Sequence, residues 1–498
     1  MKMVKSLLLG TAAGLVAMTG AQAADLPVKA KPVQYVKICS LYGAGFYYIP
    51  GTDMCLKVGG WVRSEVGYGY NSSFTAGGLV GNLNNKTSSD LVWRRRGYIT
   101  ADARNQTEYG TLRSYIAVGI SDNDTGDNVA ALQLVNVNRA FIQWAGFTIG
   151  QAQSFFDFYS GAAAQYGVVG SIGSDSGDAG WKVAGYTAQF GNGLSATVSA
   201  EMARRAGVIN AGAAAASGVL GIPTGALPLG YGAAGTVFGN GDGGFDYPDV
   251  VANLRVDQAW GSAQIMGALH GVTTVYYGAA EGSGAPNTEI GYALGAGIKL
   301  NAPMIGKGDY FQAQFTYANG ASRYTAMTAN PFSASAYDGG SYGFGYQSDG
   351  VYGGIGATGT SVELTESWSV NASYEHLWNA RWKTSLWGAY REVNYGGLAN
   401  AMMCSSMGAG AGAGTTAVAA VGCDMNWSMW GIGSRTQWNV TKDFYLGLEV
   451  LYQNLTSASM PGGVIALAAN ASKSGGVYAV SDMDNWSVRF RAHRDFYP

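Results

Sequence analysis

Residues 93–104 form a stretch in which polar and apolar side chains alternate, and this stretch limits the folds open to the chain. At a period of two, one face carries Trp93 and Ile99, which suit an apolar medium. The other face carries Arg94, Arg96 and Arg104, which suit water. The alternation returns in residues 112–118 after a short polar turn, so the two stretches predict a β-hairpin with one apolar and one basic face.

The first 23 residues have the pattern of a secretory signal peptide. Lys2 and Lys5 precede an apolar run at 7–17, and Ala21-Gln22-Ala23 supplies a cleavage site, so we expect cleavage after Ala23. Without the two lysines, 28 basic residues face 32 acidic ones, a formal charge of −4. This balance does not suggest a nucleic-acid partner.

The composition favours a membrane protein built from strands. With 76 Gly, 31 Tyr and 13 Trp but only 12% charged residues, it differs from that of an ordinary soluble enzyme. The mature sequence has no run of 18 apolar residues, so it offers no candidate for a membrane-spanning helix. Tilted strands of about ten residues, each apolar on one face, are the remaining way to cross a bilayer.

Sixteen segments alternate in this way, and the connections between them are short and long in turn. Such a meander must close, because a bilayer contains no water to satisfy the backbone of an open edge. We therefore expect an all-β fold, a sixteen-stranded antiparallel transmembrane β-barrel with short periplasmic turns and long extracellular loops. The expected organisation is a signal peptide at 1–23, a periplasmic segment at 24–59 and a barrel at 60–498, with a constriction loop near 152–179.

A barrel of sixteen strands is too wide for its own side chains to fill, so its inward faces line water. This predicts a channel for passive diffusion of ions and small hydrophilic solutes, without enzymatic activity. One positive segment of the channel wall is predicted from five arginines on three neighbouring strands; the alternative is a solvated, salt-bridged face. The five are Arg94, Arg96, Arg104, Arg113 and Arg139.

The third long loop carries acids beside a run of aromatic residues. These acids are Asp157, Asp175 and Asp178, and the aromatic run lies within 155–159. If the loop folds inward, its acids face the arginines across a constriction and influence ion selectivity.

The four cysteines form two local pairs, Cys39 with Cys55 and Cys404 with Cys423, and an oxidising periplasm permits both disulfides. Four unpaired thiols are the alternative. No C-x-x-C or Cys/His cluster predicts a metal site. Two G-x-G-x-x-G matches, at 230–235 and 354–359, lack a strand-to-helix context, so no cofactor is predicted.

The block from Cys39 to Gly60, followed by Arg-Arg-Arg-Gly-Tyr-Ile at 94–99, resembles the general porins of alphaproteobacteria, the Omp2-type family of Brucella and rhizobia. The resemblance covers nearly the whole mature chain. It implies a homotrimer in the outer membrane, among lipid and lipopolysaccharide, with the third loop folded into each channel. Trimerisation rests on the resemblance alone.

Two features depart from the expected pattern of a transmembrane β-barrel. The chain ends Phe496-Tyr497-Pro498, whereas outer-membrane barrels usually end on an aromatic residue. Arg95 lies on the apolar face beside Trp93, and we expect it near the rim or in a subunit contact.

Two other functional classes stay open for this chain. One is a substrate-specific channel, for example for sugars, and the other is a non-transport adhesin or secreted β-protein.

Overall fold

The structure is a computed structural model that describes residues 37–69, 91–124, 134–158, 164–166, 177, 179–211, 228–229, 239–278, 281–326, 332–353, 359–408, 422–459, 463–467 and 476–498. The predicted signal peptide, Asp175 and Asp178 lie outside these residues.

Within the described residues, sixteen antiparallel strands form one closed barrel, which confirms the predicted fold class. The barrel closes where the last strand pairs with the first, from Trp61 opposite Asp495 to Tyr68 opposite Val488. In order around the wall the strands are β2 (Cys55–Tyr68), β3 (Leu91–Thr107), β4 (Gly110–Asp124), β5 (Leu134–Trp144), β6 (Phe147–Ala152), β7 (Trp181–Gly191), β8 (Leu194–Glu201), β12 (Asp249–Gln258), β13 (Gly261–Val272), β14 (Glu289–Asn301), β15 (Tyr310–Asn319), β20 (Glu366–Leu377), β21 (Trp382–Asn394), β22 (Trp427–Asn439), β23 (Phe444–Thr456) and β26 (Met483–Asp495).

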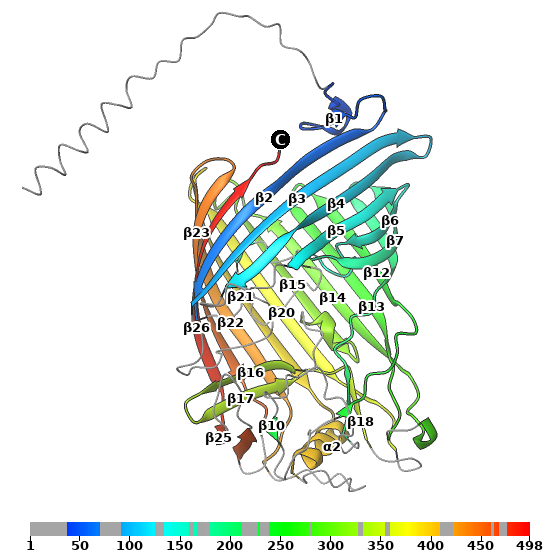
Figure 1. Cartoon of the computed structure of the whole chain (residues 1–498), viewed down its shortest axis with the longest axis vertical. Helices are drawn as coiled ribbons and strands as arrows, with labels where there is room; N and C mark the ends of the chain where they lie inside the picture. Colours follow the sequence, from blue (N-terminus) through cyan, green and yellow to red (C-terminus); the bar gives the residue numbers. More distant parts are fainter. Residues whose placement is uncertain are drawn as a thin grey trace, which may run out of the picture.

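Short turns and long loops occupy opposite ends of the barrel, as the sequence predicts. The short turns lie at the top of Figure 1 together with the C-terminus and β1 (Tyr47–Tyr48), and the long connections lie at the bottom. At the turns 145–146 and 192–193 the backbone of all four residues has positive φ, 48° at Ala145 and 88° at Gly146 for example. Turns of this conformation match the twist of the strands they join.

Side chains alternate strictly between the two faces of the wall. Along β22, for example, buried and exposed positions follow one another from Met429 to Gln437. Large apolar side chains such as Ile99, Ile265 and Leu294 are exposed on the outside. Buried residues on the inside are largely polar, so the barrel has an apolar exterior and a polar interior.

The two ends of the chain pack together at the short-turn rim. A disulfide joins Cys39 to Cys55, and β2 begins at Cys55, five residues before the expected start of the barrel. The Phe496 and Tyr497 rings lie where a Cβ on Gly60 or Gly59 would be, so only glycine fits there. This tight contact fixes the C-terminal residues against the first strand. The N-terminal residues that precede β2 also contain η1 (Ser40–Tyr42).

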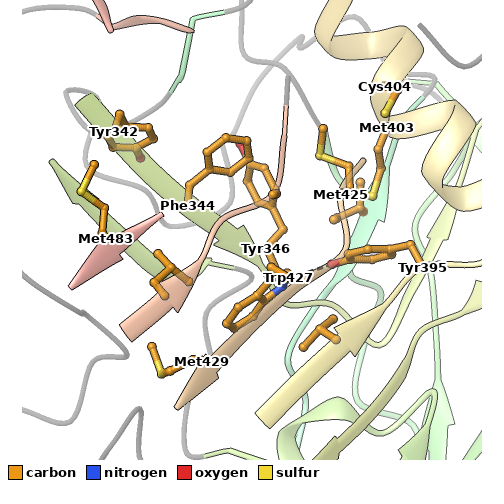
Figure 2. Close-up of a cluster of buried hydrophobic side chains, with 14 of the residues drawn as sticks. Tyr342, Phe344, Tyr346, Tyr395, Met403, Cys404, Met425, Trp427, Met429 and Met483 are labelled. Atoms are coloured by element: carbon orange, nitrogen blue, oxygen red, sulfur yellow. Dashed lines mark hydrogen bonds between the residues drawn. The ribbon is translucent and has the colours of Figure 1, made fainter. Parts of the chain in front are cut away.

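Parts of the long loops form two small sheets, and their apolar side chains share a hydrophobic core with residues of β21, β22 and β23. Figure 2 shows the rings of Tyr346, Tyr395 and Trp427 beside methionine side chains such as Met403 and Met425. The Trp427 indole N–H and the Tyr395 hydroxyl both donate to the Tyr346 carbonyl. One sheet contains β10 (Pro228–Leu229), β24 (Val464–Leu467), β25 (Gly476–Val480), β17 (Ser341–Tyr346) and β16 (Phe332–Asp338), and the other contains β11 (Gly239–Asn240), β9 (Val208–Asn210), β18 (Gly350–Tyr352) and β19 (Glu363–Leu364).

Short helices complete these loops: η2 (Glu281–Ser283), η3 (Ser322–Tyr324) and α2 (Gly397–Gly408). A disulfide joins Cys404, in α2, to Cys423. Of the helices in the described residues, none has the length and apolarity needed to span a bilayer.

Asp309, in the turn between β14 and β15, connects that turn to the end of β20. Burial favours the neutral form, but hydrogen bonds from the Leu377 N–H (2.9 Å), the Tyr374 hydroxyl (2.6 Å) and His376 Nδ1 (2.6 Å) outweigh it and lower the pKa of Asp309. The ionised carboxylate therefore stabilises the folded barrel above the unfolded pKa of about 3.9, and this stability is lost as the pH falls through the lower folded pKa.

We expect Asp309→Asn to lower the free energy of unfolding by about 1–3 kcal/mol at pH 7, because charged hydrogen bonds are lost. The difference from wild type should shrink below about pH 4 as the wild-type carboxyl becomes protonated. Heat-modifiable gel migration across a pH series measures this difference in stability. Asp443→Asn, in an exposed turn, is the control. A difference that stayed constant down to pH 2–3, roughly the end of the titration range, would contradict this role.

Candidate channel constriction

Glu65 is the centre of a basic cluster on three neighbouring strands. It lies opposite Arg94 of β3 on one side and opposite Arg491 of β26 on the other. Glu65 Oε2 accepts from Arg94 Nε at 2.7 Å, and Oε1 accepts from Arg491 Nη2 at 2.6 Å. Arg489 is 3.6 Å from the same carboxylate, which is fully buried. One carboxylate thus holds three guanidinium groups, and we call these four residues the Glu65 cluster.

Arg104 and Arg113 form a second group nearer the short-turn rim. They are paired in register, and both bind Asp102 through two hydrogen bonds, at 2.9 and 2.7 Å for Arg104 and at 3.0 and 2.9 Å for Arg113. Their side chains keep 26% and 27% exposure, so both remain accessible to solvent.

The remaining two predicted arginines lie apart from these groups. The Arg96 guanidinium lies over the rings of Trp61 and Tyr98. Arg139 donates to the carbonyl of Gly177 at 2.7 Å, and so contacts the loop between β6 and β7. The five arginines therefore face inward but form separate groups rather than one ladder.

Residues 153–180, here called the inner loop, contact inward-facing side chains on the far wall. Asn253 Nδ2 of β12 donates to the Phe155 carbonyl at 2.6 Å. The Phe158 N–H donates to Gln314 Oε1 of β15 at 3.2 Å. The Phe156 ring is fully buried and packs against the Tyr324 ring, with 4.5 Å between the two ring centroids. The loop thus enters the barrel instead of extending away from it.

Asp157 has a different place from the one expected of a lumen-facing acid. It accepts two hydrogen bonds of 2.9 Å from Arg204, and the side chains of both residues are fully buried. Arg204 also lies over the Tyr324 ring, 4.7 Å from its centroid. Two fully desolvated charges in this geometry stabilise each other only as a pair, so Asp157 anchors the inner loop and does not face the arginine wall.

Glu201, at the end of β8, supports the start of the same loop. Its carboxylate accepts from Ser154 Oγ at 2.5 Å and from the Phe155 N–H at 2.9 Å. Ser199 Oγ is a third donor at 2.9 Å. These bonds fix the loop backbone immediately before Asp157.

Tyr166 attaches the middle of the inner loop to the wall beside the Glu65 cluster. Its N–H donates to Glu449, its hydroxyl donates to Gln437 Oε1 at 2.9 Å, and its carbonyl accepts from Arg489 at 2.5 Å. The Arg491 guanidinium lies 3.8 Å from the centroid of the ring. The Tyr166 hydroxyl occupies the space that a Cβ on Gly447 would need, so a glycine in β23 makes room for it.

Sequence reasoning missed both the Glu65 cluster and the pairing of Asp157 with Arg204. Closing the predicted barrel would have put Arg489 and Arg491 of the last strand beside Glu65 of the first. No comparable signal links Asp157 to Arg204, since 47 residues and a loop separate them. No group of three metal-binding side chains occurs within the described part of the chain.

Residues 25–488 match the sequence model of the porin subfamily. The chain belongs to this subfamily. Porin Omp2a of Brucella ovis is 35% identical to this chain over 214 residues, which cover 40% of this chain and 59% of the relative. An outer membrane protein of Sinorhizobium fredii, y4fJ, is 37% identical over 157 residues, 30% of this chain and 43% of that protein. The chain spans about half the length of these curated relatives.

A solved structure supports the fold of the porin. The outer membrane channel DcaP of Acinetobacter baumannii matches with a TM-score of 0.57 at 12% identity, covering 90% of this chain and 99% of that chain. The family predicted from the Cys39–Gly60 block and residues 94–99 is confirmed, and the porin is a protein of the outer membrane.

Proposed function

We propose that this porin forms a water-filled channel for passive diffusion of ions and small hydrophilic solutes across the outer membrane, without catalysis. The observation that supports this most is the inner loop, which enters a closed barrel. Hydrogen bonds hold it there from Arg204 to Asp157, from the Phe155 N–H to Glu201 of β8 and from the Tyr166 hydroxyl to Gln437 of β22. A barrel of this strand number encloses an aqueous lumen. A loop attached inside such a lumen narrows it and so sets the size limit for solutes.

Liposome swelling with uncharged sugars of increasing size tests this function. The expected rate falls smoothly with solute size and does not saturate with concentration. Saturable uptake of one sugar would favour a substrate-specific channel. No swelling in liposomes that contain correctly folded barrels would contradict transport altogether.

The basic side of the channel and the acids of the inner loop are proposed to set ion selectivity. Asp175 and Asp178 belong to this loop, while the Glu65 cluster and Arg96 lie on the wall. We expect the double change Asp175→Asn and Asp178→Asn to shift the reversal potential toward anions, because two negative charges are removed from the pore.

The expected shift is on the order of 10 mV in a tenfold salt gradient, where complete selectivity corresponds to about 59 mV. Asp53→Asn, at an exposed position outside the barrel wall, is the matched control. An unchanged reversal potential for the double variant would mean that these acids do not influence the ion path.

We also propose a homotrimer surrounded by lipid and lipopolysaccharide. Arg95 supports it, because this side chain is exposed on the outer face of β3, opposite Ser64 of β2. Chemical cross-linking in detergent tests this, and a species of monomer size alone would contradict it.

A further inference from the structure

The inner surface of β2–β5 carries aromatic rings that a water-filled channel does not need. These four strands lie side by side in the wall (Figure 1). Trp61, Tyr115 and Phe141 all face inward and are half-buried, so part of each ring remains accessible. Exposing apolar rings to water is unfavourable, and the strand ladder already holds this wall together. The rings therefore call for an explanation other than wall stability.

The same arrangement of three side chains occurs twice on this wall. Trp61 and Tyr98 are cross-strand neighbours whose rings stack at 4.7 Å, and the Arg96 guanidinium lies 5.5 and 5.3 Å from the two ring centroids. Tyr115 and Phe141 are likewise cross-strand neighbours that stack at 5.3 Å, with Arg113 at 5.1 and 5.3 Å. We call each group a ring station.

The second station keeps hydrogen-bond donors for a ligand. Arg113 donates Nε and Nη2 to Asp102 and Nη1 to Gln143. A guanidinium has five N–H groups, so one on each terminal nitrogen points elsewhere. N–H groups on a planar cation match the oxygens of a carboxylate, and the neighbouring ring faces match a flat apolar group.

We propose that the second ring station binds planar aromatic carboxylates during their passage through the channel. The inference rests on the proposed function, and it adds a preferred class of solute. The ring of the solute stacks along the aromatic pair while its carboxylate binds the guanidinium. A chloride ion contacts only the guanidinium and a neutral sugar contacts only the aromatic rings, so neither solute makes both contacts.

Wild-type porin in planar bilayers tests this with three added solutes in potassium chloride. Benzoate has both ring and charge, cyclohexanecarboxylate has the charge without the aromatic ring, and benzyl alcohol has the ring without the charge. We expect benzoate to reduce the chloride current saturably, with a half-maximal concentration about tenfold lower than for either other solute. Equal effects of benzoate and cyclohexanecarboxylate would overturn the stacking, and equal effects of benzoate and benzyl alcohol would overturn the charge contact.

Phe141→Leu then removes one ring but keeps an apolar side chain of similar size. It should reduce the difference between benzoate and cyclohexanecarboxylate several-fold, by about the energy of an aromatic pair. Phe315→Leu, at an exposed position on the outer face of β15, is the matched control and should leave the difference unchanged. An unaltered benzoate preference in Phe141→Leu would overturn the second station. Absence of any chloride current in the wild type would instead overturn the channel itself, so the two failures are distinguishable.

Discussion

Replacing Arg204 by methionine is expected to destabilise the barrel and to detach the inner loop from the far wall. The change removes the guanidinium from the fully buried ion pair with Asp157, and breaking a buried pair in this way costs about 3–5 kcal/mol. With its anchor lost, the loop samples positions away from β12–β15. Single-channel recordings should show larger and noisier currents, and heat-modifiable gel migration should show a lower unfolding temperature.

Two further variants separate the anchor from a general effect of losing an arginine. Arg205→Met removes the guanidinium of the next residue, whose ion pair with Asp242 is partly exposed. It should change the single-channel currents and the unfolding temperature little. Asp157→Leu combined with Arg204→Met replaces both charges and should restore much of the lost stability, because neither charge of the pair is then left buried without the other. Wild-type currents and stability in Arg204→Met would show that the pair does not hold the loop.

Replacing Glu65 by glutamine is expected to have the second large effect, on both selectivity and stability. Arg94, Arg489 and Arg491 lose the one carboxylate they share, so their mutual repulsion is no longer offset. The free energy of unfolding should fall by about 3–5 kcal/mol, as for other broken buried pairs. The additional net positive charge should shift the reversal potential toward anions.

Glu108→Gln is the matched control for this change. Glu108 is exposed in the turn between β3 and β4, so its loss should affect neither stability nor selectivity. The selectivity readout does not depend on the stability readout, because it is taken from channels that have inserted. A Glu65→Gln channel with wild-type reversal potential would exclude the Glu65 cluster from the ion path.

The strands of this porin are predictable because side-chain alternation is a local property. Residues 93–104 show both faces of β3 in the sequence alone, and the structure places Arg94, Arg96 and Arg104 on the inner face as that pattern requires. The expected barrel starts at residue 60, whereas β2 begins five residues earlier at Cys55, so Gly59 and Gly60 lie within the strand. These glycines serve the contact with Phe496 and Tyr497, which no local pattern reveals.

The charge pairs are less predictable because they depend on distant parts of the chain. Glu65 meets Arg491 only because the barrel closes, and Asp157 meets Arg204 only because the inner loop folds inward. Sequence reasoning treated Asp157 as equivalent to Asp175 and Asp178, although burial gives it a different role. Register and closure would recover the first pair from the predicted strands, whereas the second requires the path of the loop.

Single-channel conductance measured against salt concentration is the most direct test of whether this porin is an open diffusion channel. Purified porin in planar bilayers should produce discrete current steps. Their size should rise in proportion to potassium chloride concentration, as for ions that cross a water-filled pore. Folded barrels that insert without producing steps, or a conductance that saturates with salt, would contradict an open diffusion channel.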